Sequence, residues 1–325
     1  MDRRLRRDGV DPIDIHHSPA LAADAARSMK VYRANYFRTL GQPRAEHAVN
    51  VPVQLIVNRR DPYVRPYVYD DIARWVPQLW RRDLHAGHWA PMSHPAQLAA
   101  AVGEFVDHLQ GAPAARTLAR ARVGVSRPPF GDQLVSITGA GSGIGRATAL
   151  AFAERGAEVV VSDIDEDAAA ETAAQIGAAG GTAHAYRLDV ADADAVERFA
   201  ERVCDIHGVP DIVVNNAGVG HAGFFLDTPA ANFDRVMDIN FGGVVNCCRS
   251  FGKRLAERGA GGHIVNVASM ASYAPVNVMN AYCTSKAAVY MFSDCLRAEL
   301  DSAGVKVSTI CPGVVGTNIV EATRF

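Results

Sequence analysis

A tyrosine and a lysine four positions apart are the residues of this sequence best suited to acid–base chemistry. Tyr282 and Lys286 stand in "YCTSK" within a predicted helix, which places their side chains on one face, a turn apart. A phenol with a pKa of about 10 is a poor base at neutral pH, but an adjacent ammonium favours the phenolate. Ser269 ends the predicted strand "HIVNVAS", from which its hydroxyl can reach the same place and hold a substrate oxygen. Taken alone, a Y-x-x-x-K pair is more often a surface aromatic and a solvated lysine.

A glycine-rich stretch offers a place for a phosphate. "TGAGSGIG" (138–145) follows a β-branched run and precedes a helical one, so its backbone can approach a pyrophosphate at a helix N-terminus. Asp163 ends the next predicted strand, where a carboxylate accepts ribose hydroxyls and repels a 2′-phosphate. Ser142 occupies a loop position where a basic residue would favour that phosphate. The pattern indicates NAD rather than NADP. The alternatives are that the loop is a plain glycine-rich turn and that Asp163 only caps the next helix.

The elements that must position these residues alternate between strand and helix from residue 131 onward. Repeated β-α units predict an α/β fold, a doubly wound parallel Rossmann sheet of order 3-2-1-4-5-6 with helices on both faces. The six predicted strands are "QLVSITG", "EVVVSD", "TAHAYRLDV", "PDIVVNNAG", "GHIVNVAS" and "VKVSTICPG".

The first part of the chain has a different pattern. It contains one clear strand, "VPVQLIVNRRDP", an amphipathic stretch, "DIARWVPQLWRRD", and a helix, "QLAAAVGEFVDHLQG". Residues 113–130 hold Pro, Gly and Arg without apolar periodicity, which is typical of a linker. We therefore expect three parts: 1–112, the linker 113–130, and the nucleotide-binding domain 131–325.

The composition of the chain limits the classes of binding partner that we expect. A formal net charge of −2 gives no electrostatic case for nucleic acid or an anionic membrane, and no apolar run is long enough to span a bilayer. The six cysteines include no C-x-x-C pair, which indicates reduced thiols in a cytoplasmic protein. The eleven histidines show no metal-binding spacing, so we expect no metal site.

The second part resembles the short-chain dehydrogenase/reductases. The resemblance rests on "TGAGSGIG", "NNAG", Asn240 in "VMDIN", Ser269, "YCTSK" and "PGVVGT", in this order. It implies that Tyr282 is the general acid/base, that Lys286 lowers the pKa of Tyr282 and holds the nicotinamide ribose, and that Ser269 orients the substrate. Asn240 would anchor a water that relays protons from Lys286, although a buried structural amide is the alternative.

The same resemblance implies a set of cofactor contacts. The loop residues would line the phosphates and ribose, Asp163 the adenosine ribose, and the others the adenine, the groove and the nicotinamide. They are Gly139, Ser142, Gly143, Ile144, Gly145, Asp163, Asp189, Val190, Asn216, Ala217, Gly218, Pro312, Gly313 and Thr317, together with Tyr282 and Lys286.

Residues 30–110 resemble the end of an α/β-hydrolase of the epoxide-hydrolase type. Asp61 after "VPVQLIVNRR" would be the triad acid, His88 in "HAGHW" the base, and Tyr32 a cap-domain residue that polarises the epoxide. No G-x-S-x-G or similar nucleophile elbow precedes Asp61, so we expect no hydrolase activity, and an Asp and a His that merely pack remain an alternative.

The chain resembles a piece of a fused hydrolase–dehydrogenase that is short at both ends. We expect the family's seventh strand to be missing, and the sixth strand to be an exposed apolar edge. The resemblance implies hydride transfer between NAD and a small-molecule secondary alcohol or ketone, hydrophobic or lipid-like. It leaves open a homo-oligomer, and an inactive or cofactor-binding-only fragment is the alternative.

Overall fold

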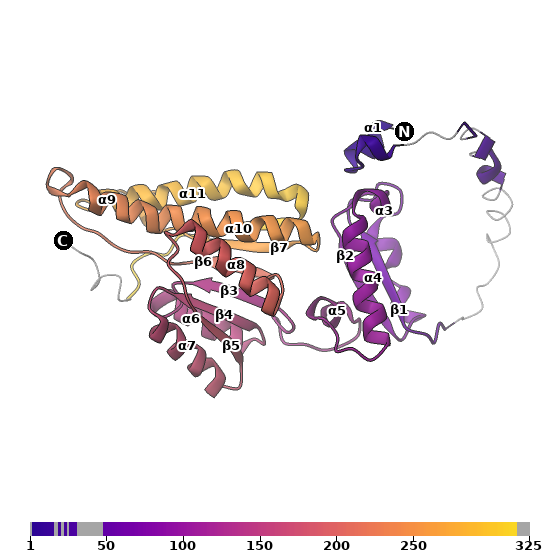
Figure 1. Ribbon diagram of the computed structural model, residues 1–325, viewed down its shortest axis with the longest axis horizontal. Coiled ribbons are helices and arrows are strands. Elements are labelled where there is room, and N and C mark those ends of the chain that lie inside the picture. The colour runs from indigo at the N-terminus through magenta and orange to yellow at the C-terminus, as the bar shows by residue number, and fades with distance from the viewer. Residues whose placement is uncertain (1, 16–18, 21–22, 25, 31–47, 317–325) are drawn as a thin grey trace. The chain divides into compact units, whose positions relative to one another are not determined.

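The computed structural model describes the chain except residues 1, 16–18, 21–22, 25, 31–47 and 317–325 (Figure 1). The chain forms two compact units, Met1–Val125 and Ser126–Phe325. Each unit has hydrophobic clusters of its own, around Leu118 in the first and around Phe251 and Val161 in the second. Each unit therefore has a hydrophobic core of its own.

The second unit is built on a six-stranded sheet in which every pair of neighbours is parallel. The spatial order β5-β4-β3-β6-β7-β8 confirms the predicted order 3-2-1-4-5-6. The strands are β3 (Leu134–Thr138), β4 (Glu158–Asp163), β5 (Thr182–Arg187), β6 (Ile212–Asn215), β7 (Gly262–Val267) and β8 (Val305–Ile310).

Helices cover both faces of this sheet, as alternate residues of β4 show. Val159 and Val161 belong to the cluster shared with α6 (Gly143–Glu154) and α7 (Glu166–Ala178). Val160 points to the other face. The main helices on that face are α8 (Ala193–His207), α10 (Gly243–Arg258) and α11 (Asn280–Leu300), which Figure 1 shows on the opposite side of the sheet from α6 and α7.

A π-turn, Asp238–Gly242, joins α9 (Ala230–Met237) directly to α10. The 3-10 turns of this unit are η4 (Phe225–Asp227), η6 (Met270–Ser272) and η7 (Asp301–Ala303). The π-turn places Asn240 in the protein interior, where the side chain is completely buried.

The first unit contains a second strand that the sequence did not reveal. β1 (Val53–Asn58) pairs in parallel with β2 (Leu79–Leu84), which lies in the stretch read only as amphipathic. The sequence did not predict a strand here because β2 contains two adjacent arginines. Both form ion pairs in the structure, Arg81 with Asp70 at 2.9 Å and Arg82 with Glu104. The helical elements here are α1 (Asp2–Arg7), η1 (Pro12–Asp14), η2 (Pro66–Tyr69), η3 (Ile72–Arg74), α3 (Ala90–Ser93), α4 (Pro95–Leu109) and α5 (Arg116–Ala121).

Helix α5 lies inside the segment 113–130 that the sequence marked as a linker. Its Leu118 is fully buried in a cluster with Trp80, and the Arg122 guanidinium stacks 4.3 Å from the Trp80 ring centre. One turn and a half of helix is too short to show apolar periodicity, so the sequence could not reveal it. The limits 1–112 and 131–325 remain a prediction, and the boundary between units falls at 125/126.

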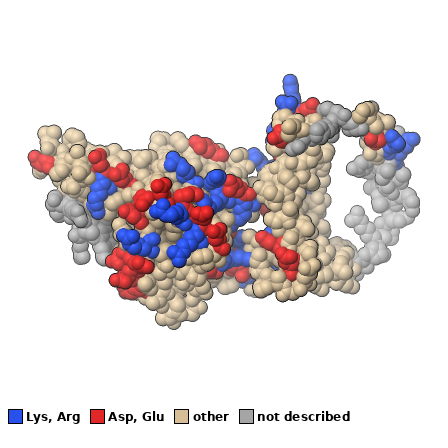
Figure 2. Space-filling view, viewed as in Figure 1, with Lys and Arg blue, Asp and Glu red and all other residues tan. Residues whose placement is uncertain are grey.

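Charges of both signs alternate on the visible face of the second unit (Figure 2). An ion pair joins α10 to α8, where Arg254 lies 2.8 Å from Glu197. Among the residues that the structure describes, no helix has both the length and the apolar character that a bilayer crossing requires.

Candidate active site

Lys286 is fixed to the carboxyl end of β7. Its side chain is only 3% exposed, and Nζ donates a hydrogen bond of 2.9 Å to the carbonyl of Val267, the last residue of that strand. Nζ lies 5.9 Å from the centre of the Tyr282 ring, one turn earlier on α11. Ser269 follows the same strand by two residues. The structure thus brings together the three residues whose spacing suggested acid–base chemistry.

Burial dominates the electrostatics of this cluster. It lowers the pKa of Lys286 from 10.5 to about 8, because the buried ammonium loses hydration. Burial also raises the pKa of Tyr282 above its ordinary value, and a hydrogen bond with Ser269 acts in the opposite direction. Nζ is bonded to a backbone carbonyl, and Ser269 is the group whose hydrogen bond favours the phenolate, so the lowering of the Tyr282 pKa by Lys286 remains a prediction.

Ser269 holds its position through its own backbone. Its Oγ accepts a hydrogen bond of 3.1 Å from the N–H of Ala271, which starts the short turn η6 with Ser269 as its cap. The hydroxyl retains its proton to donate. It can therefore contact both Tyr282 and a substrate oxygen.

Asn240 ties the loop after β6 to helix α11. Its Oδ1 accepts from the N–H of Val219 at 2.7 Å, and its Nδ2 donates to the carbonyl of Val219 and to Ser285 Oγ, both at 3.0 Å. Ser285 is the residue before Lys286. Both amide protons are engaged, so the side chain has a positioning role, and the predicted water relay remains a prediction.

The glycine loop fits against the end of β6 because two glycines lack a Cβ. Gly139 has φ +62°, and a Cβ there would lie 2.7 Å from the Cα of Ala217. A Cβ on Gly145 would overlap the carbonyl of Gly139. Asn216 Nδ2 donates to the carbonyls of Thr138 and Gly139, both at 3.0 Å. The loop is thus shaped by the neighbouring strand before any ligand binds.

Ser142 caps the N-terminus of α6 without a side-chain capping bond, and Gly143 follows with φ +52°. Ile144 is half-buried. Arg146 on the first turn donates to the carbonyl of Gly141 at 2.9 Å, which fixes the outer part of the loop. The first N–H groups of α6 therefore meet the loop at a defined place, as an anion site at a helix N-terminus requires.

Asp163 ends β4 next to this loop. Its Oδ2 accepts from the N–H of Gly141 at 2.9 Å and its Oδ1 from the N–H of Asp165 at 3.1 Å. Each carboxylate oxygen has lone-pair capacity left for a ribose hydroxyl. The cap of α7 is Asp165, which accepts from the N–H of Ala168 at 3.1 Å, so the structure assigns the capping role to a different residue.

The residues expected near the adenine lie after β5. Asp189 Oδ1 accepts from the N–H of Ala191 at 3.0 Å, and the carbonyl of buried Val190 accepts from Asn246 Nδ2 at 3.0 Å. Gly243 makes room for Val190, since a Cβ there would lie 2.6 Å from its Cγ2. This segment is therefore anchored to α10.

The residues expected near the nicotinamide are described less completely. A Cβ on Gly218 would lie 3.4 Å from Lys286 Nζ, so this glycine borders the buried lysine. The carbonyl of Pro312 accepts from the N–H of Met270 at 2.9 Å, which brings the segment after β8 beside Ser269. Gly313 is exposed, and Thr317 lies outside the described residues.

A family model described as short chain dehydrogenase matches residues 133–324, more than half of the chain. The chain belongs to the short chain dehydrogenase family. Residues 13–95 match a second model, described as alpha/beta hydrolase fold. The dehydrogenase unit therefore follows a partial hydrolase segment.

The chain is 66% identical over 321 residues to a protein named "Probable oxidoreductase EphD" in Mycobacterium tuberculosis, a match that covers 98% of this chain and 54% of that protein. It thus spans about half the length of the EphD proteins that it matches. D-threitol dehydrogenase of Mycolicibacterium smegmatis is 40% identical over 183 residues, 56% of this chain and 70% of that protein.

Two solved structures show the range of cofactors in the family. A short chain dehydrogenase/reductase from Burkholderia phymatum in complex with NAD has a TM-score of 0.58 and 36% identity, and the match covers 59% of this chain and 69% of that one. A structure from Beutenbergia cavernae with NADP bound at low occupancy has a TM-score of 0.58 and 32% identity, covering 61% and 78%.

The dehydrogenase unit has a cavity of about 580 Å³ on the outer side of α6. Gly143, Ile144 and Phe152 line it together with Val315 and Gly316 from the segment after β8. It includes two of the expected cofactor residues and none of Ser269, Tyr282 and Lys286. The cavity therefore touches the glycine loop at the start of α6 and does not include the acid–base cluster.

The partial hydrolase segment contains the expected acid–base pair. His88 Nδ1 lies 2.8 Å from Asp61 Oδ2, and Asp61 Oδ1 accepts from the N–H groups of Tyr63 and Val64 at 2.8 and 3.0 Å. Burial acts to raise the pKa of Asp61, but these hydrogen bonds hold it below its ordinary value. Tyr32, the expected epoxide-polarising residue, lies outside the described residues.

Sequence reasoning missed two residues of the dehydrogenase site. Thr138 Oγ1 accepts from the N–H groups of Asn216 and Ala217 at 3.1 and 3.2 Å, which joins β3 to the end of β6. Ser285 connects Asn240 to α11 by accepting from Asn240 Nδ2 and donating to the carbonyl of Tyr282 at 2.7 Å. Thr138 and Ser285 lie inside "TGAGSGIG" and "YCTSK", and this position in the motifs is the sequence signal that could have identified them.

Proposed function

We propose that the dehydrogenase unit catalyses the NAD-dependent interconversion of a secondary alcohol and a ketone. The observation that carries this proposal is the cluster at the end of β7. There the buried Lys286 is held by the carbonyl of Val267, and Tyr282 is hydrogen-bonded to Ser269. Such a cluster can hold a substrate oxygen and move a proton to or from it.

Each residue has a distinct task in this proposal. Ser269 donates a hydrogen bond to the substrate oxygen, and Tyr282 takes its proton during oxidation or returns it during reduction. Lys286 binds the nicotinamide ribose and, in its charged form, favours the phenolate of Tyr282. The nicotinamide cofactor supplies the acceptor or donor of hydride when bound.

The cofactor fits the residues that are present. Gly139 and Gly145 stand where a Cβ would collide with Ala217 and with the carbonyl of Gly139, so only glycines let the loop pack this closely against the end of β6. Asp163 places a carboxylate beside the loop, which favours two free ribose hydroxyls over a 2′-phosphate. This residue supports the proposed preference for NAD.

The catalytic role is tested by Tyr282→Phe. We expect turnover of a secondary alcohol to fall by about 10² to 10⁴, since the proton acceptor is lost, while NADH binding changes little. Tyr290→Phe is the matched control, because Tyr290 lies on the same helix and pairs with Tyr273 instead. Turnover that survives in the Tyr282 variant contradicts the mechanism.

Cofactor choice is tested by thermal unfolding of the full chain with NADH and with NADPH. A ligand that binds only the folded state raises the melting temperature, so NADH should give the larger shift. An equal or larger shift with NADPH contradicts the role proposed for Asp163. Binding of NADH without oxidation of any alcohol would favour the alternative, a chain that binds the cofactor without turnover.

The six cysteines, all in the dehydrogenase unit, are free thiols, which supports a reducing, cytoplasmic compartment. Burial raises the pKa of Cys248 to about 12 and that of Cys204 to about 11, so these thiols stay protonated and unreactive at neutral pH. Alkylation of the protein in freshly lysed cells should label exposed Cys295 first, and isolation of an oxidised, disulfide-linked form would contradict this compartment.

A further inference from the structure

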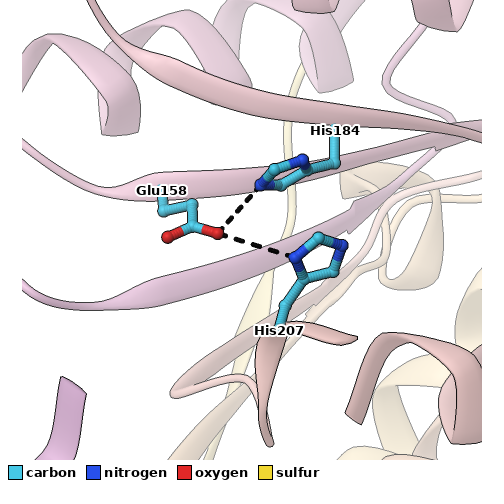
Figure 3. A group of neighbouring side chains, drawn as sticks. All are labelled: Glu158, His184 and His207. Atoms are coloured by element: carbon cyan, nitrogen blue, oxygen red, sulfur yellow. Dashed lines mark hydrogen bonds and ion pairs between the residues drawn. The ribbon is translucent and has the colours of Figure 1, made fainter. Parts of the chain in front are cut away.

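Three side chains of metal-binding type converge at the edge of the sheet opposite to the acid–base cluster. Glu158 is the first residue of β4, whereas Asp163 at the cofactor loop is the last. His184 lies on the neighbouring strand β5, and His207 is the last residue of α8. Figure 3 shows both imidazoles directed at the Glu158 carboxylate.

The strand register brings the first two residues together. His184 pairs with Val160, two positions beyond Glu158, so both side chains lie on the sheet face that α8 covers. His207 reaches them from the end of α8, where Gly208 with φ +85° ends the helix. Residues far apart in the sequence thus meet through one strand pair and one helix end.

The distances suit a small divalent cation. His184 Nε2 lies 2.9 Å and His207 Nδ1 lies 3.7 Å from Glu158 Oε1, and the donor atoms of all three residues lie within 4.8 Å of one another. Bonds of about 2.0–2.1 Å in a tetrahedral site put ligand atoms roughly 3.3 Å apart. The two separations from Glu158 Oε1 lie on either side of that value.

The surroundings of His207 fix which nitrogen it offers. Its Nε2 lies 2.7 Å from the hydroxyl of Tyr186, which leaves Nδ1 facing Glu158. A tyrosine phenol is neutral at pH 7 and its oxygen can accept the Nε2 proton. A metal-bound histidine usually donates its second N–H to such a partner.

A hydrogen bond alone explains only part of this arrangement. It accounts for His184 and Glu158, but 3.7 Å from His207 Nδ1 is too long for one. The two imidazoles stack at 4.0 Å with 27° between their planes, so at least one ring must rotate before both nitrogen lone pairs can point at a common ion. The side chains of His184, Glu158 and His207 are 32%, 24% and 9% exposed, so an ion can enter.

We propose that Glu158, His184 and His207 form a binding site for Zn²⁺ or a similar divalent transition metal. Two imidazoles and one carboxylate are a donor set that Zn²⁺ accepts, and a water completes the coordination. The ion joins the end of α8 to β4 and β5 and so braces the edge of the sheet. This site is independent of the dehydrogenase chemistry.

Zinc binding to the metal-stripped full chain tests the site, with a chromophoric chelator as competitor. We expect one Zn²⁺ per chain to bind at this site and to raise the melting temperature. His184→Gln and Glu158→Gln should each weaken that binding at least tenfold. Tyr186→Phe, which keeps all three ligands, should weaken it by about 10- to 100-fold through the lost partner of His207.

His263→Gln is the matched control, since His263 is also a half-buried sheet histidine but bonds to Ser308 on β8. It should bind Zn²⁺ like the parent chain. Co²⁺ added to the parent chain should give the visible absorption of a tetrahedral site, a measurement that needs no variant to fold. Absence of that spectrum, or equal zinc affinity in the parent, His184→Gln and His263→Gln chains, overturns the proposal.

Discussion

The ammonium of Lys286 loses most of its hydration when it is buried in the folded protein. The hydrogen bond that the structure describes in place of that hydration is the one to the carbonyl of Val267. This loss of hydration is why its pKa falls to about 8. A lysine that titrates near neutral pH can change its charge when a cofactor binds. The unfavourable burial is therefore consistent with a functional role and has no evident benefit for stability.

The pH dependence of stability should report this burial. Below pH 8 the amine of Lys286 is protonated in both the folded and the unfolded state, and the full free-energy cost of burying the ammonium is present. Between pH 8 and 10.5 the folded state loses its proton first, so the free energy of unfolding should rise, by up to about 3 kcal/mol at ~1.4 kcal/mol per pKa unit. Lys286→Met should remove this rise.

Urea unfolding of both proteins at pH 7.5 and pH 10 measures it. The difference between parent and variant cancels the titration of the cysteines and tyrosines in the same range. A difference that stays constant between the two pH values would mean that Lys286 is hydrated in the folded protein.

At the scale of elements, side-chain bonds join the strand ends that form the site. Thr138 on β3 accepts from the two backbone N–H groups of Asn216 and Ala217 that follow β6. Thr138→Val keeps the shape but leaves those donors without this acceptor. We expect it to lower the free energy of unfolding by about 1–3 kcal/mol and to weaken NADH binding, both measurable by thermal and urea unfolding.

Thr309→Val on β8 is the control. Among the described residues, the buried Thr309 hydroxyl has no hydrogen-bond partner, so its removal should be neutral or stabilising. Equal losses in the two variants would show that the Thr138 hydroxyl is not what holds the loop.

Much of the dehydrogenase sheet was predictable because β3, β4, β6, β7 and β8 are rich in β-branched residues and alternate with helical stretches. β2 was missed because "LWRRDL" carries its charges in ion pairs with Asp70 and Glu104, which only the folded chain reveals. The short α5 was missed because only Leu118 and Ala121 of its residues are buried. Pattern reasoning failed where tertiary partners, and not periodicity, decide the structure.

The acid–base cluster was predictable because Tyr282 and Lys286 are neighbours on one helix. The cluster of Glu158, His184 and His207 was not, because no two of its members share an element. The register between β4 and β5 sets the distance between Glu158 and His184, and the end of α8 brings His207 to them. The expectation of no metal site rested on local spacing, which does not report ligands assembled across elements.

At the scale of the whole molecule, β8 is an outer strand of the described sheet and pairs with β7 alone. Val305 and Val307 of this strand are buried and Ile310 at its end is 48% exposed, so only the end of the strand presents an exposed apolar side chain. A further strand or another copy of the chain could cover this edge. We propose that a second copy of the chain covers this edge in a homo-oligomer. Sedimentation of the purified chain that finds only a monomer would contradict this proposal.

The substrate belongs to this scale as well, since a hydrolase segment and a dehydrogenase unit share one chain. We propose a hydrophobic, lipid-like alcohol. Phe224, Phe225 and Leu226 support it, because they are exposed and lie between β6 and α9, after the cofactor-groove residues. We expect kcat/KM to rise with chain length in a series of secondary alcohols, and a flat series would contradict the proposal.

The π-turn at Asp238–Gly242 sets the rotation of α10 relative to α9. Each residue of an α-helix turns the chain by about 100°, and a π-turn absorbs one extra residue. Deleting a single residue there would restore a plain α-helix, so the stripe of Cys247, Phe251 and Leu255 would still face the sheet, but Asn240 would lose its place beside Val219 and Ser285. The extra residue of the π-turn therefore serves the position of Asn240, and the length of this segment is a constraint on the site in addition to the residue types that it contains.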